Sequence, residues 1–222
     1  KDMAVEKVHY LGLLKSVLGY VDTENYTYGQ LFNETNARTG GIQCGVDVFD
    51  KADDPEAFRA MFTIRGKALY PQMDFLFQMM EEILNTSKIT DTKRLYEIIA
   101  EIKSRGQASL IGSGHQTAVL RGASYGSPMA RFQDEMAGVG YYKFIEDLEK
   151  NFQDKKAEIV AGLENAMAEI IRRDSFMVSY TGERESVEQL KALSGSLKKS
   201  LKESSCQVPE VAITCEKKNE GF

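Results

Sequence analysis

The sequence predicts an α+β fold in which helices cover one face of an antiparallel-rich sheet. Two stretches on either side of a turn-rich loop, residues 50–56, alternate apolar and polar side chains, as paired antiparallel strands do. The apolar positions of this alternation are Ile42, Cys44, Val46, Val48, Phe58, Ala60, Phe62 and Ile64. The polar positions between them indicate that only one face needs a cover. An apolar helical stripe over residues 73–84 follows directly and can supply that cover.

The composition is that of a globular protein from a reducing compartment. The chain has 222 residues, of which 42% are hydrophobic, so it is long enough to bury a core. Its formal net charge of −5 argues against a general nucleic-acid or anionic-membrane surface. No apolar run approaches the roughly 20 residues of a membrane span, and three widely spaced cysteines fit neither a disulfide framework nor a zinc knuckle. We therefore expect a cytoplasmic protein, with an organelle matrix as the alternative.

Two helices of different character precede the predicted strands. Residues 5–18 are apolar nearly all round at helical spacing, which indicates a buried helix. A second helix is predicted to begin after Thr27, because Thr27 and Gln30 have the spacing of a capping box. The pair Gly40 and Gly41 should end that helix just before the first strand.

The elements after the hairpin are predicted to be mainly helical. Asp91 is a plausible cap for a helix that weakens at Gly106. Residues 112–128 are rich in small side chains, so we expect short helical pieces with close backbone contacts there, and burial of Val119 and Leu120. Three more helices are predicted over residues 141–152, 159–170 and 187–201.

Two further strands are predicted near the end of the chain. A third strand is expected from the alternation of Phe176, Val178 and Tyr180, and a closing strand from Val211, Ile213 and Cys215, with Pro209 marking an edge position. Since the sequence starts without an initiating Met, we expect residues 1–222 to be a single domain from a longer chain.

One short motif suggests nucleophilic catalysis. Residues 122–126 match the G-x-S-x-G elbow around Ser124, which needs a preceding strand and a histidine base. Here the preceding residues are predicted to be helical, and both His9 and His115 lie upstream of the serine. A serine hydrolase that uses Ser124 is therefore kept only as an alternative.

Metal and anion sites find little support in the residues. The two histidines lie far apart, and neither has a second ligand three or four positions away, as a helical zinc site requires. His9 is expected to be a hydrogen-bonded histidine within a buried helix. The glycines before His115 could expose amides to an anion, but the full phosphate-loop spacing is missing, so we interpret this stretch as a loop.

Two stretches of the sequence resemble a known family. Residues 28–42, and residues 121–128 together with 138–144, are similar to the presequence-protease subgroup of insulinase- or pitrilysin-type (inverzincin) zinc metallopeptidases. Specifically, they resemble the third of the four homologous domains of these proteases, which begins the non-catalytic C-terminal half. The similarity extends over nearly the whole chain.

The resemblance implies that this segment has no catalytic or metal-binding residues. In that family an H-x-x-E-H helix of the first domain holds zinc, and its glutamate is the general base. The equivalent helix here has His9, Gly12 and Leu13 at the three motif positions, so only the first histidine is retained. In the full-length enzyme, zinc would be bound by another domain.

The resemblance also implies a function for the polar face of the predicted sheet. Such peptidases degrade unfolded peptides inside a closed chamber, so other domains of the same polypeptide and unfolded peptides would be the partners, with no nucleic acid and no membrane. The residues expected to line the chamber are Gln43, Asp47, Arg59, Thr63 and Arg65. The alternative is a stand-alone structural or interaction scaffold of the same fold. An H-x-x-E-H segment upstream in the same reading frame would distinguish the two.

Overall fold

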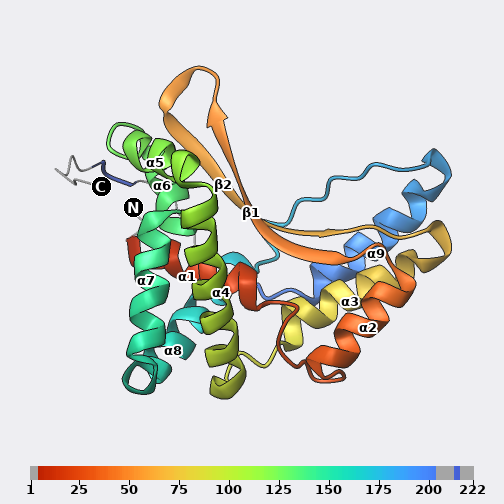
Figure 1. The fold of residues 1–222 in the computed structure, drawn as a ribbon. Coiled ribbons are helices and arrows are strands. Elements are labelled where there is room, and N and C mark those ends of the chain that lie inside the picture. Colours follow the sequence, from red (N-terminus) through yellow and green to blue (C-terminus); the bar gives the residue numbers. More distant parts are fainter. Residues whose placement is uncertain (1–4, 204–212, 216–222) are drawn as a thin grey trace.

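The computed structural model describes residues 5–203 and 213–215, in which helices pack against one face of a single β-hairpin (Figure 1). The elements in chain order are α1 (Val5–Val17), α2 (Tyr28–Arg38), β1 (Ile42–Lys51), β2 (Asp54–Gly66), α3 (Met73–Thr86), α4 (Thr92–Gly112), α5 (Gly114–Ala123), α6 (Pro128–Ala137), α7 (Val139–Lys150), α8 (Phe152–Ile170) and α9 (Val187–Ser200). Short 3-10 turns, Tyr70–Gln72 and Arg184–Ser186, precede α3 and α9. The predicted α+β class is confirmed. Within these residues, no helix is both long and apolar enough to cross a bilayer.

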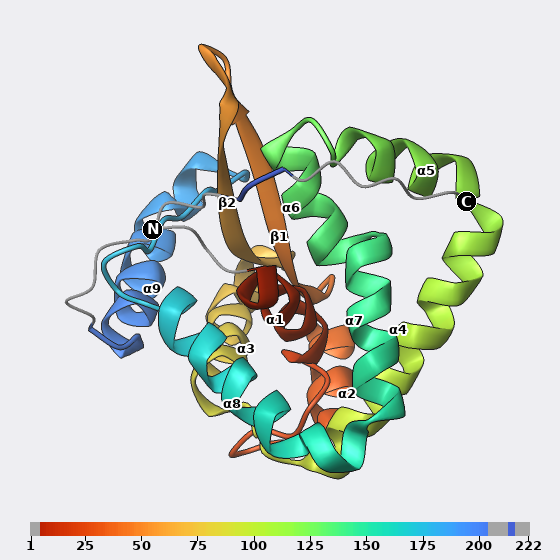
Figure 2. The same cartoon turned by 90° about the vertical axis from the view of Figure 1, so that its left-hand side faces the viewer.

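The hairpin is longer than its apolar alternation predicts. β1 and β2 pair antiparallel from Ile42 opposite Gly66 as far as Lys51 opposite Asp54, with an irregularity between Asp50 and Lys51. Only residues 52 and 53 form the turn, so the expected loop over residues 50–56 is wrong. Backbone pairing needs no apolar side chains, and a two-residue connection is enough to close a hairpin. The turn end therefore projects beyond the helices (Figures 1 and 2).

Helices α1 and α6 pack against the apolar face of the hairpin. Phe58 of β2 joins Val8 and Leu11 of α1 and Phe132 and Met136 of α6 in a small buried cluster. The opposite face is open to solvent, because Gln43, Arg59 and Arg65 are exposed there. The prediction of a sheet with helices packed against one face is confirmed.

Helix α1 lies in the interior, as its nearly uniform apolar surface predicts. Val8, Leu13, Leu14 and Val17 are fully inaccessible to solvent. Their neighbours are α6, α7, α8 and β1, so most of α1 is enclosed, while Glu6 and Lys7 near its start are exposed. The larger core cluster extends from α1 to α3, α4, α7 and α8.

The capping box at the start of α2 is confirmed in atomic detail. The backbone N–H of Gln30 donates to the Thr27 hydroxyl at 3.3 Å, and the Gln30 side-chain oxygen accepts from the Thr27 N–H at 3.0 Å. After α2, Gly41 has a φ of +100°, a backbone conformation that other L-residues rarely adopt. The glycine pair thus turns the chain from the helix into β1, as expected.

Several later predictions are wrong. Residues 176–180 are not in a strand, although they alternate as one. Helix α4 continues through Gly106 to Gly112, and the ring of Tyr142 packs against the helix where Gly106 has no side chain. Val119 is 72% exposed on α5, so its expected burial is also wrong. Of the predicted closing strand, Ile213–Cys215 are not in a strand, and Pro209 and Val211 lie outside the described residues.

Candidate functional site

The outer face of the hairpin brings together the five polar residues that the alternation singles out. In the strand register Gln43 lies opposite Arg65, and Gly45 lies opposite Thr63. Residues directly opposite each other, and every second residue along a strand, share one face. Asp47 and Arg59 belong to the same set of positions, opposite Met61 and Phe49 respectively. We call the face of the hairpin that carries Gln43, Asp47, Arg59, Thr63 and Arg65 the outer hairpin face.

The outer hairpin face is charged but not uniformly polar. Arg65 forms an ion pair with Asp47, which lies diagonally across the two strands. Phe49 is 52% exposed near the turn and shares this face with Met61. These two apolar residues are not among the five predicted ones, although their odd-numbered positions in the alternation assign them to the same face. The face therefore offers cations, an amide and an aromatic ring side by side.

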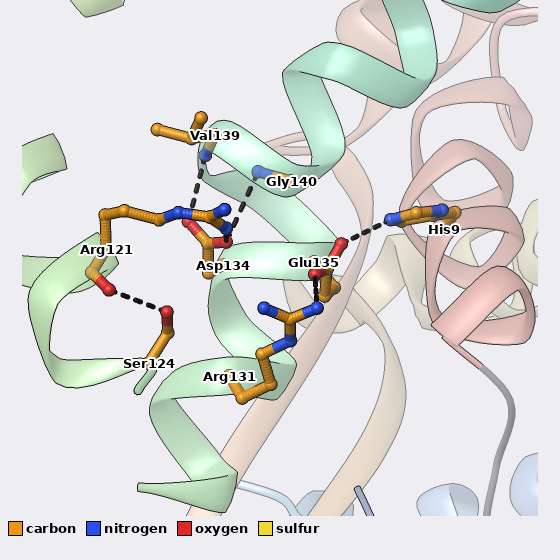
Figure 3. Close-up of polar contacts among 8 residues, drawn as sticks. All are labelled: His9, Arg121, Ser124, Arg131, Asp134, Glu135, Val139 and Gly140. Atoms are coloured by element: carbon orange, nitrogen blue, oxygen red, sulfur yellow. Dashed lines mark hydrogen bonds and ion pairs between the residues drawn. The ribbon is translucent and has the colours of Figure 1, made fainter. Parts of the chain in front are cut away.

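A second polar site lies buried where α1, α5, α6 and α7 meet (Figure 3). We call its five residues, His9, Arg121, Arg131, Asp134 and Glu135, the ionic cluster. Arg121 of α5 contacts Asp134 of α6 at 2.5 Å, and Arg131 contacts Glu135 at 2.6 Å one helical turn along α6. The Nε2 atom of His9 lies 2.6 Å from the other oxygen of Glu135. Two cations thus neutralise two buried carboxylates, and each carboxylate has further partners.

The start of α7 is shaped around these carboxylates. The two oxygens of Asp134 accept hydrogen bonds from the backbone N–H groups of Val139 at 3.0 Å and Gly140 at 3.3 Å (Figure 3). A Cβ atom on Gly138 would lie 2.5 Å from an Asp134 oxygen, and one on Gly140 would lie closer still to a Glu135 oxygen. Both positions therefore require glycine. This explains why the second family-like stretch combines Arg121 with a Gly-Val-Gly sequence.

Electrostatics keep Glu135 ionised despite its burial. Burial by itself raises the pKa of this carboxyl group, since the charged form loses hydration. The hydrogen bond from His9 and the positive charges of Arg131 and Arg121 outweigh that effect and hold the pKa below its ordinary value. The ionic cluster was not predicted from the sequence. The spacing of Arg131 and Glu135 was a visible signal, whereas the partnerships with His9 and α5 were not.

The residues at the degenerate metal motif do not fit a zinc ion. Nε2 of His9 is hydrogen-bonded to Glu135, and Glu135 also forms an ion pair with Arg131. A zinc ion bound at His9 would therefore lie close to the buried positive charge of Arg131. A side chain at Gly12 would strike the Met136 carbonyl oxygen, since its Cβ would lie 2.6 Å away, and Leu13 is fully buried in the core. In the part of the chain that the structure describes, no three His, Cys, Asp or Glu residues are grouped as metal ligands.

Ser124 does not have the geometry of a catalytic nucleophile. It follows helix α5 rather than a strand, its side chain is fully buried, and its hydroxyl donates to the Arg121 carbonyl oxygen at 2.7 Å. An elbow serine must instead present its hydroxyl to substrate. The alternative of a serine hydrolase is therefore wrong for this serine.

Gly112 ends α4 and Gly114 begins α5, so Ser113 alone separates the two helices. The N–H groups of Gln116 and Thr117 donate to the carbonyl oxygen of Ser113 at 3.0 and 3.1 Å. These amides are used within the first turn of α5, and the interpretation of this stretch as a loop is wrong, because its residues other than Ser113 are helical.

Both sites lie in one α+β domain, whose class follows from its family. The family described as Peptidase M-16C associated matches residues 1–148. The chain therefore belongs to this family, which confirms the resemblance to a presequence-protease-like domain.

Longer proteins are similar to this chain. Protein HypA of Clostridium perfringens is 31% identical over 97% of this chain and 22% of its own length. The mitochondrial presequence protease of Yarrowia lipolytica is 28% identical over 77% of this chain and 17% of its own length. Presequence protease 1 of Arabidopsis thaliana, named as chloroplastic and mitochondrial, is 25% identical over 74% of this chain and 15% of its own length. The chain thus spans about a fifth or less of these relatives.

Proposed function

We propose that this chain is a non-catalytic part of a presequence-protease-like zinc metalloendopeptidase that degrades unfolded peptides in a closed chamber. Family membership supports this proposal, as do the relatives named presequence protease. The metal would be held by another domain of the same polypeptide, because the helix that corresponds to the zinc-binding helix has lost two of three motif residues. We further propose the cytoplasm as its location, to be tested by cell fractionation.

The observation that carries the proposal is the outer hairpin face. Its five predicted residues lie on one exposed side of two long strands, opposite the side that α1 and α6 cover. Arg59, the Arg65–Asp47 pair and Phe49 can contact acidic, basic and aromatic side chains of an extended peptide. Such mixed chemistry suits a chamber wall that holds many different peptides. Enclosure, and not a deep specificity pocket, would then select substrates by size.

The test is a charge reversal in the full-length polypeptide, Arg59→Glu, assayed with an acidic and a basic fluorogenic peptide of equal length. We expect kcat/KM to fall for the acidic peptide and to rise for the basic one, each by roughly fivefold at low salt, since an exposed charge contact contributes up to about 1 kcal/mol. Added salt should reduce both changes.

The matched control is Arg105→Glu on α4, where the Arg105 side chain is 79% exposed and forms an ion pair with Glu101 of the same helix. This control variant changes the net charge of the protein by the same amount, but the substituted residue lies on α4 and not on the hairpin. The chamber-wall proposal fails if Arg59→Glu and Arg105→Glu give the same ratio between the two peptides.

The scaffold alternative makes a different prediction for the same preparation. A full-length polypeptide that serves only as a structural scaffold would contain no stoichiometric zinc and would cleave neither peptide. Measuring bound zinc by mass spectrometry, together with chelator-sensitive cleavage, separates the two functions before any variant is made.

A further inference from the structure

Gly45 occupies a position on the outer hairpin face where the fold of the described residues does not require a glycine. It lies within β1, opposite Thr63 of β2. Its φ is not positive, unlike that of Gly19 and Gly41. Among the described residues, the only atom within 4 Å of a Cβ at this position would be Oγ1 of Thr63, at an ordinary contact distance of 3.4 Å. Because β-branched and aromatic residues suit a strand better than glycine does, the glycine needs another explanation.

The missing side chain leaves a gap on the outer hairpin face. Gln43 and Asp47 flank Gly45 along β1 on the same face, and both carry side chains. Between them, the space that a side chain of residue 45 would fill borders only on Thr63. We call this gap, with Thr63 at its side, the Gly45 notch. A glycine inside a strand often marks a place where a ligand or another backbone approaches closely.

The hydroxyl of Thr63 is the polar group that borders the Gly45 notch. Its oxygen is almost inaccessible to solvent and has no hydrogen-bond partner among the described residues. Buried polar groups are nearly always hydrogen-bonded, so an exception calls for an explanation. A hydroxyl can donate one hydrogen bond and accept others. The Thr63 hydroxyl can therefore pair with a polar group that enters the notch.

The ion pair between Arg65 and Asp47 spans the Gly45 notch. The two residues belong to opposite strands and lie on opposite sides of the notch, so the pair that joins them crosses it. The Arg65 side chain is 68% exposed, and ion pairs at exposed positions contribute little to stability, because water and salt screen them. The guanidinium of Arg65 can therefore turn from Asp47 to another acceptor.

We propose that the Gly45 notch is a subsite for the main chain of an extended peptide substrate. The Thr63 hydroxyl donates to a carbonyl oxygen of the peptide, and the absent side chain at Gly45 lets the peptide main chain lie close to the sheet. Arg65 donates to a second carbonyl oxygen when its pair with Asp47 opens. This inference rests on the proposed function, because a substrate reaches the notch only if the outer hairpin face lines the chamber.

A main-chain ligand fits the Gly45 notch better than a charged side chain does. The two charges that flank the notch, on Arg65 and Asp47, have opposite signs and neutralise each other. They therefore favour neither an acidic nor a basic side chain. A carbonyl oxygen is present at every residue of a peptide, so the contact is independent of the peptide sequence, whereas Arg59 discriminates between peptides by charge.

The test is Gly45→Val in the full-length polypeptide, assayed with the same acidic and basic fluorogenic peptides of equal length. Filling the notch should raise KM for both peptides by the same factor, roughly fivefold, which is the loss of about one hydrogen bond. We expect kcat to change by less than about twofold, because the contact is made with bound substrate and transition state alike. Gly45→Ala fills less of the notch and should raise KM less.

Thr63→Val is the second variant, because valine keeps the shape of the side chain and removes the hydroxyl. We expect a similar rise of KM, roughly fivefold for both peptides. Thr63→Ser retains the hydroxyl and should recover most of the loss. In a protein that already carries Gly45→Val, Thr63→Val should have little further effect. The Thr63 series decides the proposal even if Gly45→Val fails to fold.

Three outcomes overturn the proposal. If KM is unchanged for both peptides in Thr63→Val and in a folded Gly45→Val, no substrate contacts the notch. If KM rises for one peptide only, the ligand is a side chain. If kcat falls together with Tm while KM stays constant, the role of these residues is structural. The chamber-wall proposal is judged separately, since a changed peptide ratio in Arg59→Glu with unchanged KM in Gly45→Val and Thr63→Val would remove only the notch.

Discussion

At the scale of single residues, the glycines at the start of α7 show how neighbouring charged side chains can determine which residue type a position accepts. Gly138 and Gly140 are required because the carboxylates of Asp134 and Glu135 occupy the space that a side chain would need. These carboxylates are in turn held by arginines and by the helix start itself. Glycine is needed at both positions because the ion-paired carboxylates leave no room for a side chain. A positive φ is not the reason, since neither glycine has one.

We predict that Gly140→Ala destabilises the chain by about 1–3 kcal/mol, because the new Cβ would overlap a Glu135 oxygen in a tightly packed region. The measurement is the free energy of unfolding from denaturant titration. Gly122→Ala on α5 is the control, since it has open space around its Cβ and should be neutral or stabilising by up to about 1 kcal/mol. A harmless Gly140→Ala would contradict the packing described here.

Glu135 should contribute stability that depends on pH. Its folded-state pKa is held below the ordinary value of 4.5, so its stabilising effect is complete above that pH and is lost as the pH falls through the depressed value. We expect the difference in free energy of unfolding between the wild type and Glu135→Gln to be constant near neutral pH and to shrink below about 4.5. A difference that does not change between pH 7 and pH 3 would argue against the ion pairs.

At the scale of elements, local sequence signals account for most of the helices. The nearly continuous apolar surface of residues 5–18 predicts the buried α1, and the spacing of Thr27 and Gln30 predicts the first residue of α2. The strand alternation predicts the hairpin but not its length, since the polar residues beside the turn pair through their backbone alone. The unpaired residues 176–180 show the converse, because a strand pattern forms no strand without a partner edge.

The capping box offers a test at this scale. Thr27→Ala should destabilise the chain by about 1 kcal/mol, because the N–H of Gln30 loses its acceptor at the first turn of α2. Thr27→Ser retains the hydroxyl and should recover most of the loss. Thermal unfolding monitored by circular dichroism compares the two variants, and equal Tm values for Thr27→Ala and Thr27→Ser would exclude a contribution from the cap.

At the scale of the whole molecule, the ionic cluster joins α1 to the three consecutive helices α5, α6 and α7, which follow it by more than 90 residues in the sequence. His9 comes from α1, Arg121 from α5 and the two carboxylates from α6, while α7 supplies backbone donors. Because every member is buried or nearly so, separating these helices would leave charges without partners in a medium of low polarity. The cluster therefore fixes the relative positions of the helices beneath the hairpin.

A double-mutant cycle measures this connection. Arg121→Met alone should cost about 3–5 kcal/mol, because it leaves the fully buried Asp134 without its cation. Arg121→Met combined with Asp134→Leu should be less destabilising than the sum of the two single substitutions, by at least about 1 kcal/mol. Simple additivity of the free energies of unfolding would show that the two side chains do not interact.

The sequence by itself determined the α+β class, the order of the main helices, the existence of a one-sided hairpin and the family resemblance. These features follow from periodicity and from short motifs, because such patterns act through local backbone geometry and do not depend on which distant segments come into contact. Only the tertiary structure decided that His9 pairs with Glu135, that Ser124 is enclosed, and that residues 176–180 stay unpaired. Each of these depends on which distant segments meet, because a buried charge or a strand edge is stable only with a partner that local sequence does not specify.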